Sequence, residues 1–239
     1  MALIALIPAR SGSKRIPNKN IKELAGHPLI AYTVQAAKDA GIFDRIIVST
    51  DSHLIGGIAM QYGAKYIPRN SEYRDGPHFP WIIELAIRRG GLAEDSFALL
   101  FPTNPFRTGE TIKKAWLTFV DYEIASSLIS IKQVKEHPWK MWDSTQLPHI
   151  FPILGEDEKL YNLPSEKLGN IYVQNANFRI FKYETLMKGD ELGNYILGYE
   201  TTMPEALDIN DEYDWMLAET LIEKGLAKLP EIKGDDINA

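Results

Sequence analysis

The chain has 239 residues, of which 45% are hydrophobic, and a formal net charge of -6. A chain of this length can bury one substantial core, and its acidic balance disfavours sequence-independent binding to nucleic acid or to an anionic membrane. The absence of cysteine excludes a disulfide scaffold, a thiolate nucleophile and cysteine-ligated metal sites. With five histidines and no His-Glu-x-x-His pair, zinc chemistry is also disfavoured.

The N-terminal segment does not read as a targeting signal. Met1 to Pro8 is apolar, but it is short, lacks a basic leader and runs directly into Arg10. No uninterrupted apolar stretch approaches the ~18 residues that a membrane span needs. We therefore expect a cytoplasmic protein with no membrane contact.

Strands and helices alternate through the first half of the chain. Continuous apolar runs predict buried strands, and stretches with a helical apolar period predict helices that end at glycine. The predicted strands are 2–7, 45–49, 64–67 and 96–101, and the predicted helices are 29–40, 54–62, 79–89 and 110–122. Because this order is typical of βαβ units, we predict an α/β fold with a Rossmann-like, mainly parallel sheet flanked by helices.

The pattern changes after Ser126. Strands are predicted at 127–131 and 171–181, and a final helix at 213–224. Residues 132–169 are rich in Pro, Trp and Tyr and have no helical period, which indicates an inserted arm. The expected organisation is an α/β domain of residues 1–131 and 170–230, an arm of residues 132–169 and a flexible tail of residues 231–239.

The loop from Ile7 to Asn20, after the first predicted strand, carries the strongest functional signal. It combines small, flexible residues with four cations, which are Arg10, Lys14, Arg15 and Lys19. Backbone amides in a Gly/Ser turn can face phosphate oxygens, and four cations can neutralise a triphosphate. The loop has neither P-loop nor Gly-x-Gly-x-x-Gly spacing. A solvated basic turn is the alternative, but α/β folds bind ligands at the carboxyl ends of their strands, where this loop begins.

The loop resembles the N-terminal motif of the cytidylyltransferases that activate sialic acids and related nine-carbon acids. That motif reads Ile-Pro-Ala-Arg-x-Gly-Ser-Lys-x-x-x-x-Lys-Asn, and residues 7–20 match every fixed position. The resemblance continues at Val48–Asp51, Pro68–Arg69 with Asp75, Pro102–Arg107, Gln174–Ala176, and Leu207–Asn210 with Asp214 and Trp215. It spans nearly the whole chain and implies a nucleotidyltransferase fold of the CMP-sialic acid synthetase type.

The resemblance also implies an activity and a set of site residues. The activity is the transfer of CMP from CTP to a sialic acid or a related nonulosonic acid, with release of pyrophosphate. The residues that match nucleotide-binding positions are Ala9, Arg10, Ser13, Lys14, Lys19, Asn20 and Arg69, of which Asn20 and Arg69 would hold the cytidine. Those that match sugar-binding positions are Thr103, Asn104, Arg107, Lys135, Gln174, Asn175 and Phe178. The implied catalytic residues are Arg10, Lys14, Lys19 and Asp208.

Asp208 and Asn210 are the candidate ligands for Mg²⁺, the expected cofactor. Carboxylate oxygens suit this hard cation, which retains waters and bridges substrate phosphates. Relatives often carry Asp-x-Asp here, so Asn210 stands where a second carboxylate would be. The alternative is that Asp208 and Asn210 cap the helix that begins near Glu212, and the two roles can coexist.

Two departures from the family pattern concern the acceptor sugar. Phe101 stands where sialic acid enzymes commonly carry Gln, and Asn177 lies in a stretch that usually reads Asn-Gly-Ala. Two alternatives remain: CMP transfer to another 2-keto-3-deoxy sugar acid, such as 3-deoxy-octulosonate, and a non-catalytic sugar-nucleotide-binding protein. The retained Arg10, Lys14 and Lys19 favour catalysis.

The segment 132–169 resembles the dimerisation arm of the same family. In that family the arm reaches toward the site of the partner subunit, which implies a homodimer. The aromatic residues of the arm, such as Trp139, Trp142 and Tyr161, are expected to pack within it and not to stack on bases.

Overall fold

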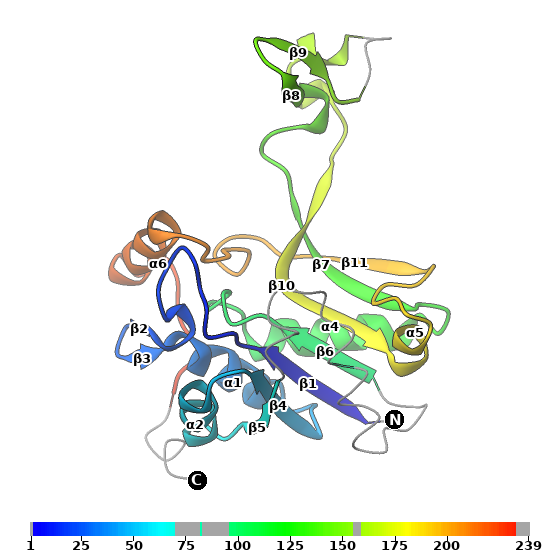
Figure 1. Ribbon diagram of the computed structural model, residues 1–239. Coiled ribbons are helices and arrows are strands. Elements are labelled where there is room, and N and C mark those ends of the chain that lie inside the picture. Colours follow the sequence, from blue (N-terminus) through cyan, green and yellow to red (C-terminus); the bar gives the residue numbers. More distant parts are fainter. Residues whose placement is uncertain (1, 70–81, 83–95, 155–158, 233–239) are drawn as a thin grey trace.

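A seven-stranded sheet forms the centre of the computed structural model, which describes residues 2–69, 82, 96–154 and 159–232 (Figure 1). Within these residues the strand order is β11-β7-β10-β6-β1-β4-β5. The strands are β1 (Leu3–Pro8), β4 (Arg45–Thr50), β5 (Lys65–Pro68), β6 (Ser96–Leu100), β7 (Ser127–Gln133), β10 (Tyr172–Lys182) and β11 (Ile196–Glu200). Six of the strands match the predicted ones to within two residues at each end, and β11 was not predicted.

The sheet is mainly parallel, as predicted. Strand β1 is parallel to both β4 and β6, β4 is parallel to β5, and β7 is parallel to β11. Strand β10 runs antiparallel to its neighbours β6 and β7. The reversal follows from the arm, because the chain leaves the body along β7 and returns along β10, and adjacent strands joined in this way are antiparallel.

Five helices accompany the sheet in the described part of the chain, and both faces of the sheet are covered. They are α1 (Leu29–Ala40), α2 (His53–Gln61), α4 (Gly109–Asp121), α5 (Tyr183–Met187) and α6 (Glu212–Glu223). Alternate β1 residues belong to different core clusters: Ala5 and Ile7 pack with α1 and α4, while Leu6 packs with Phe97 and Phe181 on the other face. Burial on both faces explains why β1 is a continuous apolar run.

Helix α1 has the bounds that the sequence predicts. It ends at Gly41, whose φ of 62° is a left-handed conformation that glycine adopts without steric cost. The smaller elements were not predicted: β2 (Glu23–Leu24), β3 (His27–Pro28), β8 (Trp142–Gln146), β9 (His149–Pro152), α5, and the 3₁₀ turns η1 (Lys19–Ile21), η3 (Pro138–Lys140), η4 (Leu160–Asn162) and η5 (Ser165–Lys167). The predicted helix at 79–89 (apart from the buried Ile82), Asp75 and residues 233–239 of the expected tail lie outside the described residues.

The described part of the segment 132–169 projects away from the body (Figure 1). Strands β7 and β10 stay paired at its base, where Val173 lies opposite Lys132, and β8 and β9 pair near its far end. The arm exposes large apolar side chains, among them Leu147, Ile150, Phe151, Ile153 and Leu154. No helix in the described ranges is both long enough and apolar enough to cross a membrane.

Candidate active site

The loop that follows β1 is fixed by hydrogen bonds to the end of β4 and by a hydrogen bond within the loop itself. Asp51, just after β4, accepts from the Ser11 amide at 2.8 Å and from the Ser11 hydroxyl at 2.9 Å. Asn20, in the turn η1 at the end of the loop, donates from Nδ2 to the Arg10 carbonyl at 2.9 Å. Hydrogen bonds to a charged carboxylate are stronger than neutral ones, so Asp51 is a firm anchor for the loop backbone.

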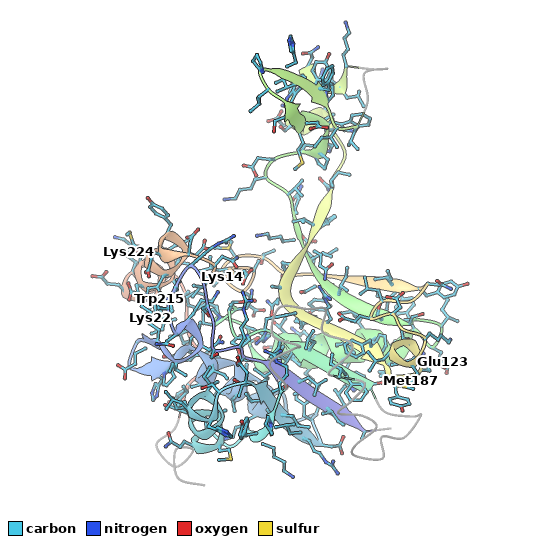
Figure 2. The ribbon with its side chains drawn as sticks, viewed as in Figure 1. Lys14, Lys22, Glu123, Met187, Trp215 and Lys224 are labelled. Atoms are coloured by element: carbon cyan, nitrogen blue, oxygen red, sulfur yellow. The ribbon has the colours of Figure 1, made fainter. Side chains whose placement is uncertain are left out.

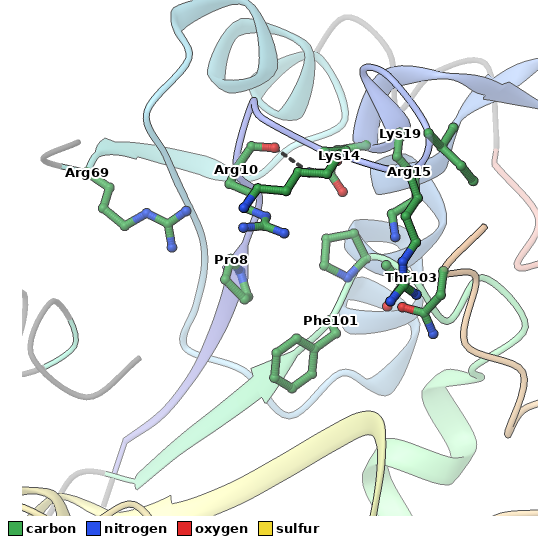
Figure 3. A pocket seen from close by; sticks show the side chains of 13 residues that line it. Pro8, Arg10, Lys14, Arg15, Lys19, Arg69, Phe101 and Thr103 are labelled. Carbon is green, nitrogen blue, oxygen red and sulfur yellow. Dashed lines mark hydrogen bonds between the residues drawn. The ribbon is translucent and has the colours of Figure 1, made fainter. Parts of the chain in front are cut away.

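The loop forms one wall of a cavity of about 520 Å³. Figure 3 shows its cationic side chains, which come from the loop and from the end of β5. They are Arg10, Lys14, Arg15, Lys19 and Arg69. Five cations around one space in an acidic protein make a site for a polyanion such as a triphosphate. This arrangement argues against the alternative of a solvated basic turn.

Most of the residues predicted to hold the nucleotide are brought together here. Six of them line the cavity: Arg10, Ser13, Lys14, Lys19, Asn20 and Arg69. Ala9 does not line it, because this side chain is fully buried in the core beside α1. Thr103, predicted on the sugar side, lines this same cavity.

Lys19 connects the loop to the segment before α6. Its Nζ donates to the Ile209 carbonyl at 2.6 Å. Burial lowers the pKa of Lys19, and the negative charge of Asp208 opposes that shift. Lys19 therefore places the phosphate-binding loop and the Asp208–Asn210 segment at one site.

A second contact links the chain just after the loop to α6. Lys22 lies over the Trp215 ring, 4.2 Å from Nζ to the centroid, and pairs with Glu212 at 3.1 Å. Lys14 lies on this α6 side of the body, whereas Glu123 and Met187 lie at the opposite side (Figure 2). The functional loop and α6 thus form one end of the molecule.

A larger cavity of about 990 Å³ adjoins the cationic one. Phe101 and Asn210 line both cavities, so the two spaces meet at these residues. The predicted sugar residues Lys135, Gln174 and Asn175 line the larger cavity. Its charged residues carry both signs: Lys132, Lys135 and Arg179 are cationic, and Glu136, Glu200, Asp208 and Asp214 are anionic.

Asp208 and Asn210 form the candidate metal site. Asn210 Nδ2 donates to Asp208 Oδ2 at 2.8 Å, and the buried Asp208 Oδ1 has no hydrogen-bond partner among the residues that the structure describes. A buried carboxylate oxygen without a partner is costly and is available to a cation. Among the described residues no group of three or more His, Cys, Asp or Glu side chains could hold a metal ion. This donor set suits Mg²⁺ that takes its remaining ligands from phosphate and water.

The alternative role of Asp208 and Asn210 as helix caps is wrong. The N-cap of α6 is Asp211, whose carboxylate accepts from the amides of Tyr213 and Asp214. Asp214 completes a capping box by accepting from the Asp211 amide at 3.3 Å. The helix is therefore capped without Asp208.

Three residues predicted to contact the sugar lie in the core and line neither cavity: Asn104, Arg107 and Phe178. Arg107 is fully buried, and its guanidinium donates to the Asn177 carbonyl, to Thr33 Oγ1 at 2.8 Å and to the Phe101 carbonyl at 3.1 Å. Burial lowers the pKa of Arg107 to about 9, which still leaves it charged at neutral pH. In this structure it supports the wall of the site from behind and lines neither cavity.

Asn177 is the partner that this buried arginine requires. It is fully buried, it accepts from Arg107 through its backbone and side-chain oxygens, and its Nδ2 donates to the Glu205 carbonyl at 2.8 Å. Because Asn177 lines neither cavity, this departure from the family pattern does not change the cavity surface directly.

Arg179 was missed in the sequence although it lines the larger cavity. The available signal was a single charge inside the apolar run of residues 178–181, since a cation in a central strand needs a buried partner or a functional role. Its partner is Glu191, 2.6 Å from Arg179 Nη1. That residue lies twelve positions away in a region without any recognisable motif.

Comparison with known proteins identifies the family of this chain. Residues 4–79 match the family model described as Cytidylyltransferase. The chain is 34% identical over 232 residues to the CMP-N,N'-diacetyllegionaminic acid synthase of Legionella pneumophila, with 93% of this chain and 97% of that protein covered. It is 33% identical over 225 residues to the N-acylneuraminate cytidylyltransferase of Escherichia coli. That alignment covers 93% of this chain but only 52% of the relative.

Solved structures show the same fold. The structure of CMP:2-keto-3-deoxy-manno-octonic acid synthetase complexed with CTP aligns with a TM-score of 0.69 at 14% identity, covering 94% of this chain and all of that chain. The 4-diphosphocytidyl-2C-methyl-D-erythritol synthase of Anaerococcus prevotii aligns with a TM-score of 0.62 at 12% identity, covering 93% of this chain and 96% of that chain. The chain is 34% identical to the Legionella pneumophila synthase along almost the full length of both proteins. This protein therefore belongs to the CMP-sialic acid synthetase (acylneuraminate cytidylyltransferase) family and is a cytidylyltransferase.

Proposed function

We propose that the protein transfers CMP from CTP to a nonulosonic acid and releases pyrophosphate. The observation that carries this proposal is the junction of the two cavities at Phe101 and Asn210. A cationic space suited to a triphosphate opens there into a larger space of mixed charge. The reaction needs this arrangement, because the acceptor hydroxyl must reach the phosphate that carries the nucleoside.

The acceptor is a nonulosonic acid in this proposal. One relative, matched over 93% of this chain, is named for N,N'-diacetyllegionaminic acid, and further curated relatives are named for N-acylneuraminate or pseudaminic acid. The larger cavity has room for a nine-carbon acid, and Lys132 and Lys135 supply positive charge for its carboxylate.

In the transfer step, a hydroxyl oxygen of the sugar acid attacks the α-phosphorus of CTP in line. The new bond joins that oxygen to the α-phosphorus, the bond from the α-phosphorus to the bridging oxygen breaks, and pyrophosphate leaves with the electron pair. The hydroxyl proton passes to solvent. Arg10 and Lys14 neutralise the charge that grows on the leaving phosphates, so positioning and electrostatics provide most of the rate.

Mg²⁺ is the proposed cofactor, and Asp208 and Asn210 would hold it. When bound, the ion polarises phosphate oxygens and neutralises part of their charge. Lys19 keeps this segment against the phosphate-binding loop through its hydrogen bond to Ile209. Asn210 lines both cavities. It also lies beside Asp208, whose Oδ1 has no hydrogen-bond partner among the described residues.

We also infer that the working unit is a cytoplasmic homodimer joined through the arm. The apolar side chains of Leu147, Phe151 and Ile153 are exposed in the described part of the chain and lie on or beside β8 and β9, the end of the arm that is far from the body (Figure 1). A second copy of the chain is the partner that would bury them in a closed, symmetric assembly.

Product analysis tests the proposed function. Purified protein is incubated with Mg²⁺, a nonulosonic acid and one of CTP, UTP, ATP or GTP, and the products are identified by mass spectrometry. We expect a CMP-sugar from CTP and far less product from the other nucleotides. Equal conversion of all four nucleotides would contradict the cytidine assignment, and sugar binding without any nucleotidyl product would support a non-catalytic protein.

A further inference from the structure

Arg179 and Gln174 meet at the larger cavity because β10 contains an irregularity. Gln174 lies opposite Ile131 of β7, and Arg179 lies opposite Ile129, so five steps along β10 correspond to two steps along β7. In a regular strand, residues five positions apart point to opposite faces of the sheet. The bulge brings both side chains to the same cavity, and bulges are common where a strand redirects side chains at a functional site.

The guanidinium of Arg179 is held on several sides. Its Nη1 lies 2.6 Å from Oε2 of Glu191, whose side chain is 11% exposed, and its Cζ lies 5.9 Å from the centre of the Phe101 ring. The hydrogen-bond network assigns the Gln174 amide with Oε1 toward Arg179, where it accepts from Nε at 2.7 Å and from Nη2 at 2.8 Å. The planar fork of the arginine thus holds one oxygen of Gln174 with two parallel donors.

This contact fixes what Gln174 can offer to a ligand. A glutamine amide can present an oxygen that accepts or a nitrogen that donates, and free rotation normally leaves both available. Here Oε1 is committed to Arg179, so the group left for a ligand is the donor Nε2. The ion pair with Glu191 offsets the charge of Arg179, which suits a positioning role better than direct capture of an anion.

We propose that Arg179 is a specificity-determining positioning residue that holds Gln174 as a hydrogen-bond donor to an acceptor oxygen of the sugar acid. The identity of the ligand rests on the proposed function. The acceptor oxygen belongs to the sugar carboxylate or to an N-acyl carbonyl, which share the same chemistry. A site built around a fixed donor discriminates strongly against a ligand that lacks the matching oxygen.

Two substitutions at Gln174 test the donor directly in steady-state kinetics with the full-length protein. Gln174→Glu keeps the paired contact with Arg179 but cannot donate, and Gln174→Met removes the polar group without adding charge. Both are expected to raise the KM for the sugar acid by about tenfold, the loss of one hydrogen bond to a charged or carbonyl oxygen. The KM for CTP and kcat should stay within about twofold, a split that a general loss of structure would not produce.

A double-mutant cycle tests whether Arg179 acts through Gln174. Arg179→Lys retains a charge for Glu191 but loses the planar fork, so it should raise the sugar KM in the wild-type background and have little effect in the Gln174→Met background. Lys182→Met is the matched control, because Lys182 is a cation on the same strand that lines neither cavity and bonds to the Glu123 carbonyl. It should leave all kinetic constants unchanged.

The acceptor used in the assay separates the two sources of the oxygen. If the effect of Gln174→Met disappears with a nonulosonic acid that has no acyl groups, the partner is the acyl carbonyl; if the effect persists, the partner is the carboxylate. An unchanged sugar KM in Gln174→Met, or an equal effect of Arg179→Lys in both backgrounds, overturns the inference while the wild-type protein remains active. A wild-type protein without nucleotidyl transfer would instead overturn the proposed function.

Discussion

At the level of single residues, the phosphate-binding loop depends on two kinds of side chain. Arg10 and Lys14 line the cationic cavity, whereas Asp51 holds the loop backbone through Ser11. Asn20 belongs to both kinds, because it lines the cavity and donates to the Arg10 carbonyl. Substitutions of the two kinds should therefore have different kinetic effects.

Replacing Lys14 or Arg10 by Ala should lower turnover at saturating CTP by a factor of at least ~100. Each cation is proposed to stabilise charge that grows on the leaving phosphates in the transition state. Lys113→Ala is the control, since Lys113 is an exposed cation of α4 that lines neither cavity. Near-normal turnover of either variant would show that its phosphate role is wrong.

Replacing Asp51 by Ala should act mainly on CTP binding. Both hydrogen bonds to Ser11 are lost, so the loop is less well ordered before the nucleotide binds. Hydrogen bonds to a charged group contribute about 1.5–3 kcal/mol, which predicts a fall in kcat/KM for CTP of about tenfold or more. Asp51→Asn retains an acceptor oxygen, so its kcat/KM for CTP should lie between the values of the wild-type protein and Asp51→Ala. The same kcat/KM for the wild-type protein and both variants would exclude an anchoring role.

At the level of elements, the sequence predicts those that depend on local patterns. Helix α1 is recognisable from its apolar period and from Gly41, and both act within a few residues of the chain. The direction of β10 and the position of β11 depend on pairing with β7, which is distant in sequence from both, and no local pattern encodes that pairing. Strands β8 and β9 are short, and their described side chains are mostly exposed, so they lack the buried alternation that marks a strand.

For the site too, the sequence predicts only what a local pattern contains. The cationic loop is contiguous in sequence, and its predicted residues meet at one cavity as expected, apart from Ala9. Arg107 belongs to a motif that matches the family, yet its side chain points into the core toward Asn177. The sequence could not predict this, because a motif gives the identity of a residue and not the direction of its side chain. Arg179 becomes interpretable only when Glu191 and Gln174 are seen beside it.

The start of α6 allows capping and metal binding to be separated experimentally. Asp211→Ala removes the N-cap and should lower the free energy of unfolding by about 1 kcal/mol in urea titrations, with little change in the magnesium requirement. Asp208→Ala should leave helix capping intact but raise the Mg²⁺ concentration needed for half-maximal turnover, while Asn210→Asp should lower it. An Asp208→Ala protein with an unchanged magnesium requirement would place the metal elsewhere.

At the level of the whole molecule, the arm sets the expected assembly. Light scattering at micromolar concentration should give the mass of a dimer for the full-length protein. Charged substitutions at exposed apolar positions of the arm, such as Phe151→Glu with Ile153→Glu, should shift it toward monomers, because burying a charge at an interface is unfavourable. The exposed Leu226→Glu near α6 is a control outside the arm, and a full-length monomer would contradict the assignment.

The proposed reaction requires CTP in the cationic cavity and a nonulosonic acid in the larger cavity at the same time. The most direct test measures pyrophosphate released from CTP and Mg²⁺ by the full-length protein, with and without a nonulosonic acid such as N,N'-diacetyllegionaminic acid, and with 3-deoxy-octulosonate as the alternative acceptor. We predict rapid release that requires the nonulosonic acid and falls by a factor of at least ~100 in Lys14→Ala. Release that does not depend on any acceptor, that prefers 3-deoxy-octulosonate, or that persists in Lys14→Ala would contradict this account.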